Sequence, residues 1–372
     1  MSQLRKISFY NSTETAPFLK KLIEEIESQS VYKCNENYSL PTNEYKNART
    51  FLGKVKKRYK MYLGHSLHLI KRNNSSIKVC TTNPFFAPLL SAKFKNKNVK
   101  TINLVYDLYP DALEVAGMIK KDSIVSRLVS KITSNAIKSS DVNVFLGVRL
   151  RKHAESRYGQ SKSSKIIHVG GDGSPFKDRE KIFNHKADSI AILYCGQIGR
   201  MQDGEGIIKF LEHITSVQFN KIKATFYAYG PGYEELKKSI DASQAISING
   251  AISNEVSYKE MMKSQVSLIT LIPGAENVGM PSRTYTSMLA GQAILAICSK
   301  ESDLADLVNK HDCGWVIDPN NIEEVKKALN EIQKPEILLA KRLNSYSAGH
   351  EFYDVSVLAK QWIELFDELL LK

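Results

Sequence analysis

The chain has 372 residues, enough for two domains of ordinary size at roughly 100–200 residues each. Its five cysteines are widely spaced and form no CxxC pair, which argues against a disulfide framework or a zinc site. The formal net charge is +13, no apolar run approaches the roughly 20 residues that cross a bilayer, and the N-terminus lacks the apolar core of a signal peptide. We therefore expect a cytoplasmic protein whose electric field attracts phosphate.

The first part of the chain alternates predicted strands with predicted helices. A strand is predicted in KISFYN and a helix in TAPFLKKLIEEI, and the alternation continues through IKVCTTN, PFFAPLLSAKF and VKTINLVYDLYPD. It goes on through SIVSRLVSKITSNAIKSS, DVNVFLG, VRLRKHAESRYG and SKIIHVGGDG. Because strands that alternate with helices form βαβ units, this order predicts an α/β domain built on a parallel sheet.

One segment accounts for the whole positive excess of the chain. From Tyr45 to Tyr106 the sequence holds fourteen Lys and Arg and no Asp or Glu. Within it, the stretch from Lys46 to Arg72 favours a helix, which Gly53 or Gly64 could break, and its apolar residues recur at helical spacing. A basic amphipathic helix is typical of an element that lies on a membrane surface. The docking cations would be Lys54, Lys56, Lys57, Arg58 and Lys60. The alternative is a packed helix whose outer face is only solvated.

The first carboxylate after the basic segment is Asp107, in the run YDLYPD. It follows a predicted parallel strand, and open α/β sheets bind ligands at the carboxyl ends of their strands. Asp107 is therefore a candidate functional residue. The alternative, a loop aspartate that caps the next helix, has equal weight.

The second part of the chain repeats the alternating pattern after the polar linker SPFKDREKIFNHKADS. It opens with SIAILYCGQIGRMQDGEGIIKFLEHI, which predicts a strand, a glycine turn and a helix. The segments TFYAYGPGYEELKKSI, ISINGAIS, NEVSYKEMMKSQ and ESDLADLVNKHDCGWVI follow, and the tail VLAKQWIELFDELLL is amphipathic. This pattern predicts a second α/β domain.

A stretch from Gly279 to Gly291, GMPSRTYTSMLAG, lies between two apolar runs that predict parallel strands. Ser282 can cap a helix that begins at Arg283, so free backbone N–H groups and the positive end of the helix dipole point into the loop. A strand, a loop and a capped helix make an anion site. Taken alone, the stretch is equally consistent with an ordinary βαβ crossover.

The surrounding residues resemble the nucleotide-sugar site of the retaining family-four glycosyltransferases. In the branch that builds bacterial surface polysaccharides this stretch reads roughly P-S-K-x-Y-E-x-x-A-x-G-x-P, and the matching residues here are Pro281, Ser282, Arg283, Tyr285, Ala290 and Gly291. The glycine turn similarly resembles Y-x-G-N-I-G-x-x-Q-G, with matches at Gly196, Ile198, Gly199, Gln202 and Gly204. The sequence departs from the family at Val278 and Thr286, which stand where its two glutamates would fall.

The resemblance implies roles for particular residues. Arg200 lies in the loop that supplies a cation to the donor diphosphate, where a guanidinium stabilises the leaving nucleotide. The run YDLYPD resembles the D-L-W-P turn of the same branch, so Asp107 would face the acceptor or the reacting sugar. The implied catalytic residues are thus Asp107 and Arg200, with no metal ligands. The implied donor-binding residues are Gly199, Arg200, Gly230, Gly250, Ala251, Ile252, Ser282, Arg283, Tyr285 and Thr286, the loop at 250–252 contacting the base through its main chain.

The family's GT-B fold consists of two Rossmann-like parallel-sheet domains that face each other across a cleft. We expect an acceptor-binding domain over residues 1–184, a nucleotide-sugar-binding domain over 185–350, and a helix over 351–372 that packs back on the first domain. The implied reaction is retaining, metal-independent transfer of a hexosyl group in polysaccharide biosynthesis. Its donor would be a UDP- or GDP-linked sugar, with no cofactor, and its acceptor a carbohydrate or a lipid-linked saccharide. The basic helix would hold the enzyme at an anionic membrane, the inner face of the plasma membrane.

Other functions are less consistent with the sequence. There is no Asp-x-Asp pair for a metal-bound diphosphate and no G-x-G-x-x-G of a nicotinamide-binding unit. The alternative is a basic membrane- or nucleic-acid-binding protein on a catalytically degenerate scaffold. No known nucleic-acid motif is present, and that alternative leaves the loops of the second domain unexplained.

Overall fold

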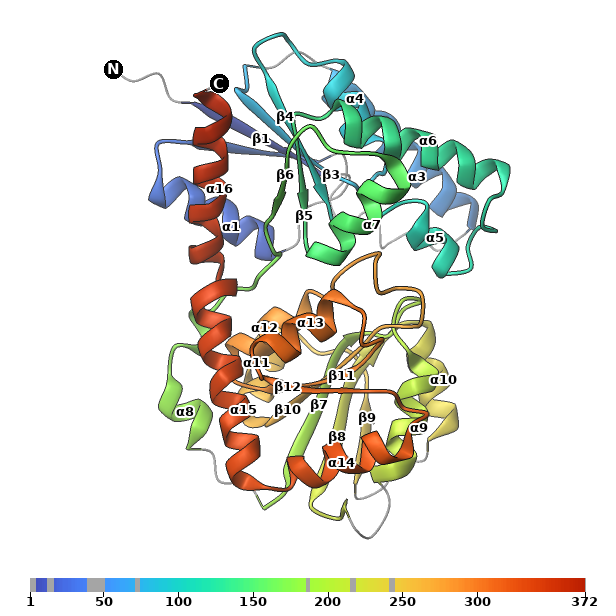
Figure 1. Cartoon of the computed structure of the whole chain (residues 1–372), viewed down its shortest axis with the longest axis vertical. Coiled ribbons are helices and arrows are strands. Elements are labelled where there is room, and N and C mark those ends of the chain that lie inside the picture. Colours follow the sequence, from blue (N-terminus) through green and yellow to red (C-terminus); the bar gives the residue numbers. More distant parts are fainter. Residues whose placement is uncertain are drawn as a thin grey trace. The chain divides into compact units, whose positions relative to one another are not determined.

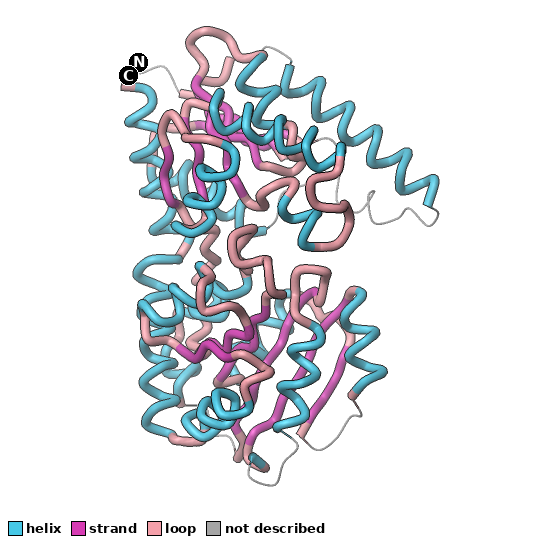
Figure 2. The backbone as a smooth tube through the Cα atoms, turned by 45° about the vertical axis from the view of Figure 1, so that its right-hand side comes forward, coloured by secondary structure: helices cyan, strands magenta, loops and turns pink. Residues whose placement is uncertain are grey.

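The computed structural model describes residues 5–11, 17–38, 51–70, 74–184, 188–214, 219–240 and 245–371. The chain divides into two compact units. The first comprises Met1–His168 together with Val355–Lys372, and the second comprises Val169–Asp354 (Figure 1). Each unit contains a six-stranded sheet with helices on both of its faces (Figure 2). Every strand pair in the two sheets is parallel.

The sheet of the first unit has the strand order β2-β1-β3-β4-β5-β6. Its strands are β1 (Lys6–Tyr10), β2 (Lys33–Asn37), β3 (Ile77–Thr81), β4 (Lys100–Val105), β5 (Val142–Phe145) and β6 (Ser164–Ile166). The central strands β3 and β5 are buried along their whole length, as expected of strands covered by helices on both faces.

The helices of the first unit are α1 (Pro17–Gln29), α3 (Phe51–Ile70), α4 (Ala87–Lys93), α5 (Asp111–Val115), α6 (Ile124–Ser139), α7 (Val148–Tyr158) and the C-terminal α16 (Val355–Leu370). Helix α16 packs on α1. The rings of its Trp362 and Phe366 meet Phe9 of β1 edge to face, with centroids 6.3 and 6.5 Å apart. This apolar contact and a hydrogen bond of 2.5 Å from the Tyr32 hydroxyl to Asp367 tie the end of the chain to its beginning.

The sheet of the second unit has the order β12-β11-β10-β7-β8-β9. Its strands are β7 (Ile190–Gln197), β8 (Ile222–Tyr229), β9 (Ile246–Asn249), β10 (Val266–Thr270), β11 (Ala293–Ile297) and β12 (Gly314–Ile317). Its helices are α8 (Arg179–Phe183), α9 (Gly204–Ile214), α10 (Pro231–Ser239), α11 (Asn254–Lys263), α12 (Arg283–Leu289), α13 (Asp303–Lys310), α14 (Ile322–Ile332) and α15 (Pro335–Ala348). A core of aliphatic and aromatic side chains, including Tyr194, Phe210 and Phe226, lies under α9 and α14.

The predicted architecture of two parallel α/β sheets is confirmed, and the differences are local. Strand β2 was not predicted, because its sequence KCNEN has no apolar alternation; as an edge strand it needs little apolar surface.

Helix α3 runs unbroken through Gly53 and Gly64, and the ends of the expected helix at 46–50 and 71–72 lie outside the described residues. The first unit ends at His168 rather than at 184, and α16 begins at Val355 after a π-helical turn at Gly349–Tyr353. Within the described ranges, no helix has the length and apolarity needed to cross a membrane.

Candidate functional site

The strand order of the second sheet reverses between β7 and β10. Strand β7 pairs with β8 on one side and with β10 on the other, so the loops that follow β7 and β10 leave the sheet in opposite directions. Ligands of open α/β sheets bind in the crevice at such a switch point, outside the carboxyl ends of the strands. The glycine turn after β7 and the stretch that leads into α12 are the two loops at this position.

The glycine turn after β7 is held against the turn after β8. The Ile198 N–H donates to the Tyr229 carbonyl oxygen at 2.8 Å, and the Gly232 N–H donates to the Ile198 carbonyl oxygen at 3.0 Å. Gly230 has a φ of +103°, and a Cβ there would lie 2.8 Å from the Ile198 carbonyl oxygen. Only glycine meets both conditions, so Gly230 allows the two turns to approach closely.

The end of the same turn is fixed by side-chain contacts. The Gly199 N–H donates to Gln202 Oε1 at 2.8 Å, and the Asp203 N–H donates to the Thr270 hydroxyl at 3.2 Å. Burial raises the pKa of the Asp203 carboxyl, which accepts a hydrogen bond of 2.8 Å from the Gly206 N–H and caps α9. Arg200 lies between these fixed points and is exposed.

Arg283 links the two loops at the switch point. One guanidinium nitrogen donates to the Gln197 carbonyl oxygen at 2.8 Å, and the guanidinium carbon lies 4.4 Å from the centre of the Tyr194 ring. The Tyr194 hydroxyl donates to the same carbonyl oxygen at 2.8 Å. The second terminal nitrogen of Arg283 is buried and has no hydrogen-bond partner among the residues that the structure describes. In this arrangement Arg283 holds the end of the glycine turn.

Helix α12 begins at Arg283, as the sequence predicts, but two details of the prediction are wrong. Ser282 has helical backbone angles and makes no side-chain capping bond. Tyr285, expected to bind the donor, is fully buried; its ring packs on Tyr353 at a centroid distance of 5.0 Å, so it belongs to the core. The carboxylates that the family places at 278 and 286 are replaced by a buried Val278 and a half-buried Thr286. The Thr286 hydroxyl lies 3.2 Å from where a Cβ on Gly171 would be.

The predicted base-binding loop follows β9. Gly250 and Ala251 are exposed and Ile252 is half-buried. A Cβ on Gly250 would meet nothing within 4 Å, so this loop is open on the surface of the second unit. Nothing in its geometry conflicts with main-chain contacts to a ligand, which remain a prediction.

In the first unit, Asp107 follows β4. The Thr82 hydroxyl donates to the Asp107 carbonyl oxygen at 2.9 Å and accepts from its N–H at 3.3 Å. The Asp107 side chain is exposed, so water solvates its carboxylate. The carboxyl is therefore mainly ionised at neutral pH. Asp107 does not cap α5, whose N-cap position is Pro110, so the capping alternative is wrong.

A buried ionic network, missed in the sequence, supports the turn that carries Asp107. Asp111 accepts hydrogen bonds from Arg157 at 2.6 Å and from the Tyr158 hydroxyl, and its carboxylate lies 2.7 Å from a ring nitrogen of His153. Burial alone would raise the pKa of Asp111, but the bonds from His153 and Tyr158 and the charge of Arg157 hold it below its usual range. Arg157 also binds Glu114 through both terminal nitrogens. No short sequence spacing reveals this network, because it joins α5 to α7.

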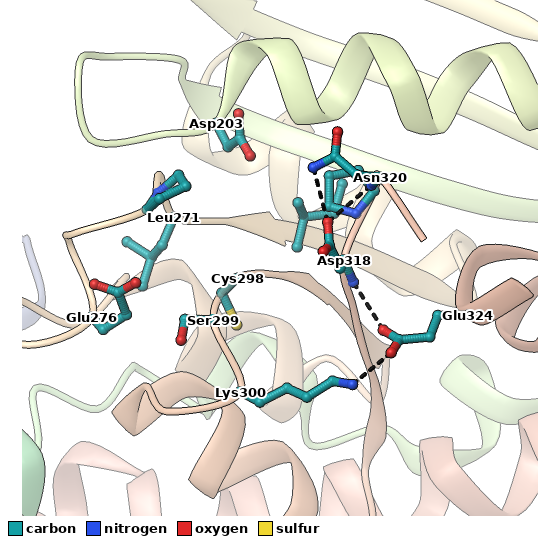
Figure 3. Close-up of a pocket in the computed structure, with 12 residues that line it drawn as sticks. Asp203, Leu271, Glu276, Cys298, Ser299, Lys300, Asp318, Asn320 and Glu324 are labelled. Carbon is teal, nitrogen blue, oxygen red and sulfur yellow. Dashed lines mark hydrogen bonds and ion pairs between the residues drawn. The ribbon is translucent and has the colours of Figure 1, made fainter. Parts of the chain in front are cut away.

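The second unit also contains a cavity of about 420 Å³ at the carboxyl ends of β10, β11 and β12 (Figure 3). Its charged lining is mainly acidic. Lys300 pairs with Glu324 at 2.5 Å, and Asp318 accepts from the Asn320 N–H at 2.9 Å. The cavity is lined by Asp203, Leu271, Pro273, Glu276, Ile297, Cys298, Ser299, Lys300, Asp318, Pro319, Asn320 and Glu324. Because like charges repel, this lining disfavours a diphosphate, which the cationic loops with Arg200 and Arg283 favour.

The second unit matches a known family. Residues 176–349 match the family model of glycosyl transferases group 1, and this range lies within the second unit. A curated protein of Pseudomonas aeruginosa, described as the probable glycosyltransferase WbjE, is 26% identical over 245 residues. The match covers 63% of this chain and 60% of that protein, which is less than two thirds of the relative's length.

Solved structures resemble the chain over nearly its whole length. Sucrose-phosphate synthase from Thermosynechococcus elongatus has a TM-score of 0.70 at 11% identity, covering 99% of both chains. HepE from Anabaena, solved in complex with UDP-glucose, has a TM-score of 0.69 at 11% identity, covering 98% of this chain and 100% of that one.

These likenesses and the two parallel sheets define the chain as a two-domain α/β protein with the GT-B fold. The predicted fold class is thus confirmed. Residues 176–349, which match glycosyl transferases group 1, and the curated relative are the likenesses from which an activity is proposed below.

Proposed function

We propose that this chain transfers a sugar from a UDP- or GDP-linked donor to a carbohydrate or lipid-linked acceptor in the synthesis of a surface polysaccharide. The observation that carries the proposal is the pair of cationic side chains on the two loops at the switch point of the second sheet, within the range that matches glycosyl transferases group 1. HepE, solved with UDP-glucose, supports this class of donor.

In the proposed mechanism, Arg200 binds the donor diphosphate and stabilises the charge that develops on the leaving nucleotide. Arg283 keeps the glycine turn in the shape that this contact requires, through its bond to the Gln197 carbonyl oxygen. The main chain of Gly199, Gly230 and the loop at 250–252 would surround the nucleotide. Asp107, on the first unit, would accept a hydrogen bond from a sugar hydroxyl.

The stereochemistry of the proposed reaction is retention, by resemblance to family four. We also propose a metal-independent reaction, because the sequence lacks the Asp-x-Asp pair that holds a metal-bound diphosphate. The ribose would meet the Thr286 hydroxyl in place of a carboxylate. The alternative, a binding protein without catalysis, is not favoured. It explains neither the family match nor the hydrogen bonds that join the turns after β7 and β8.

The experiment that tests the proposal is thermal unfolding with UDP, GDP, AMP or inorganic phosphate, each at the same concentration. A ligand at about 100 times its dissociation constant adds roughly 2.7 kcal/mol to stability. We expect UDP or GDP to raise the melting temperature well above the other ligands. Equal shifts for all four would indicate a generic phosphate site and would contradict the proposal.

A second measurement separates transfer from binding. The cognate nucleotide-sugar should release its nucleotide much faster when an acceptor saccharide is added, because only a transferase couples the two substrates. Binding of nucleotide without acceptor-dependent release would support the binding-protein alternative.

A further inference from the structure

Helix α3 exposes an apolar stripe along its outer face. Tyr59, Leu63, Leu67 and Ile70 are spaced three or four residues apart and therefore lie on one face of the helix. They are 68%, 48%, 59% and 41% exposed. The inward positions Met61, His65 and Leu69 are buried, so the helix is already packed in the fold by its other face. A surface helix normally turns its polar face to water.

The start of α6 has a second exposed apolar surface. Ile124, Val125 and Leu128 are 86%, 55% and 59% exposed, and Met118 in the preceding turn is 57% exposed. The Ser126 N–H donates to the Ser123 hydroxyl at 3.2 Å, which caps the helix just before Ile124. The backbone at this apolar end is thus held in place by a capping bond.

The two surfaces belong to one helical layer. Helix α4 packs against both α3 and α6, and the three helices lie together on one side of the first sheet (Figures 1 and 2). Helices that connect parallel strands begin at the carboxyl ends of the strands and run back across the sheet. The start of α6 therefore lies toward the carboxyl edge of the sheet, whereas the exposed apolar residues of α3 follow its middle and last turns across the same helical layer.

Exposed cations surround these apolar residues. Lys56 and Lys60 lie on α3 within a segment that has no acidic residue from 45 to 106. Around the start of α6, the exposed charged side chains are Lys120, Lys121, Arg127 and Lys131, opposed by Asp122 alone. The side chains of Lys54 and Arg58, also predicted to dock, lie outside the described residues, and Lys57 is half-buried.

We propose that the first unit docks on an anionic lipid surface through both helices, with the apolar residues of α3 and of the start of α6 in the interface and the surrounding cations on the lipid headgroups. Apolar side chains ringed by Lys and Arg are the composition that binds the boundary of an anionic bilayer. A second copy of the chain fits less well, because symmetric contact would bring like-charged patches together. The proposal does not depend on the proposed catalytic activity.

The test is sedimentation of the full chain with vesicles of phosphatidylcholine alone or with about 30% phosphatidylglycerol, at low and at high salt. We expect at least tenfold stronger binding to the anionic vesicles at low salt, and a large loss of binding at high salt. The double variant Ile124→Ser, Leu128→Ser removes apolar area from α6, and Tyr59→Ser, Leu63→Ser removes it from α3. Each should weaken binding at least tenfold. The double variant Lys120→Glu, Lys121→Glu should also weaken binding at least tenfold, because the new carboxylates repel the anionic headgroups.

Matched controls come from the second unit. Ile322 and Leu339 are 50% and 45% exposed, and Lys326 and Lys327 are exposed on α14. The variants Ile322→Ser, Leu339→Ser and Lys326→Glu, Lys327→Glu should change vesicle binding less than twofold. All substituted positions are exposed, so melting temperatures should stay near that of the wild type.

Three results would overturn the proposal. The first is equal binding to neutral and anionic vesicles. The second is binding of the α3 and α6 variants to anionic vesicles as strong as that of the wild type. The third is a dimer, measured by light scattering without lipid, that the α6 double variant abolishes, since the patch would then join two copies of the chain.

Discussion

The guanidinium of Arg283 donates a hydrogen bond of 2.8 Å to the carbonyl oxygen of Gln197, joining the two loops at the switch point of the second sheet. The same group stacks on Tyr194 at the end of β7. From sequence alone, Arg283 was expected only to bind phosphate. The structure assigns it a second task, because the turn that carries Arg200 depends on it.

This relationship predicts different effects for two substitutions. Arg283→Ala removes a stacking contact and a hydrogen bond, and should lower the free energy of unfolding by about 1–2 kcal/mol. It should also weaken binding of UDP or GDP. Arg283→Lys should recover little of either, because a lysine has no planar group that stacks and donates at once. Urea unfolding and nucleotide titration measure the two effects.

The control for Arg283 is Arg179→Ala. Arg179 is exposed and lies 5.9 Å from the Phe183 ring centre, so its loss should have little effect on stability or binding. Full rescue of nucleotide affinity by Arg283→Lys would show that charge alone matters at this position, and that the bond to Gln197 does not shape the site.

Much of the fold was predictable because its signals are local. Buried runs such as VSLIT and AILAI, each five residues long in the structure, have the apolar sequence of central parallel strands. The loops at the switch point, which carry the candidate site, could be located from the sequence because glycines and strand ends are also local signals. The features that the sequence did not predict depend on tertiary contacts. The burial of Tyr285 against Tyr353 and the network around Asp111 join residues far apart in the sequence.

The close approach of the two glycine turns predicts a contrast between two glycines. Gly230→Ala should destabilise the protein by about 1–3 kcal/mol, because it places a Cβ at a positive φ and 2.8 Å from the Ile198 carbonyl oxygen. Gly250→Ala should leave stability almost unchanged, because a Cβ there meets nothing within 4 Å. Chemical denaturation measures both. If the two variants were equally stable, the turns would not be held together as described.

His65 predicts a pH-dependent stability. It is fully buried, neither ring nitrogen has a hydrogen-bond partner in the described part of the chain, and burial lowers its pKa to about 4. The unfolded state, with a pKa near 6.5, binds the proton more readily. The contribution of His65 to the free energy of unfolding is therefore fully present above about pH 6.5. It decreases as the pH falls from 6.5 toward 4, by at most about 1.4 kcal/mol per pH unit.

His65→Leu should remove this dependence and should stabilise the protein by about 1–3 kcal/mol, since it replaces unsatisfied buried polar atoms by apolar ones. Thermal unfolding at pH 5 and pH 7.5 measures the effect. The exposed His68→Leu, on the same helix, is the matched control and should not reproduce it. A wild type that is equally stable at both pH values would contradict the prediction.

The last prediction concerns Arg200, which tests the proposed chemistry directly. Arg200 extends from a turn whose backbone is fixed on both sides by Gln202 and by the turn after β8. Because the backbone of this turn is already in place, only the Arg200 side chain has to adjust when charge develops on a leaving nucleotide, and we expect its contact to strengthen in the transition state. Removing such a contact lowers turnover more than it lowers donor binding.

Arg200→Ala should therefore reduce kcat at least tenfold, about 1.4 kcal/mol of lost transition-state stabilisation, while the melting temperature stays near that of the wild type. Because Arg200 is exposed, a loss of activity cannot be attributed to a lost core contact. Lys223→Ala, an exposed cation on β8, serves as the control and should keep full turnover. Steady-state kinetics with a donor identified from the nucleotide panel decide the matter. If Arg200→Ala raised KM for the donor without changing kcat, the guanidinium would bind the ground state and transition state equally, and its catalytic role would be excluded.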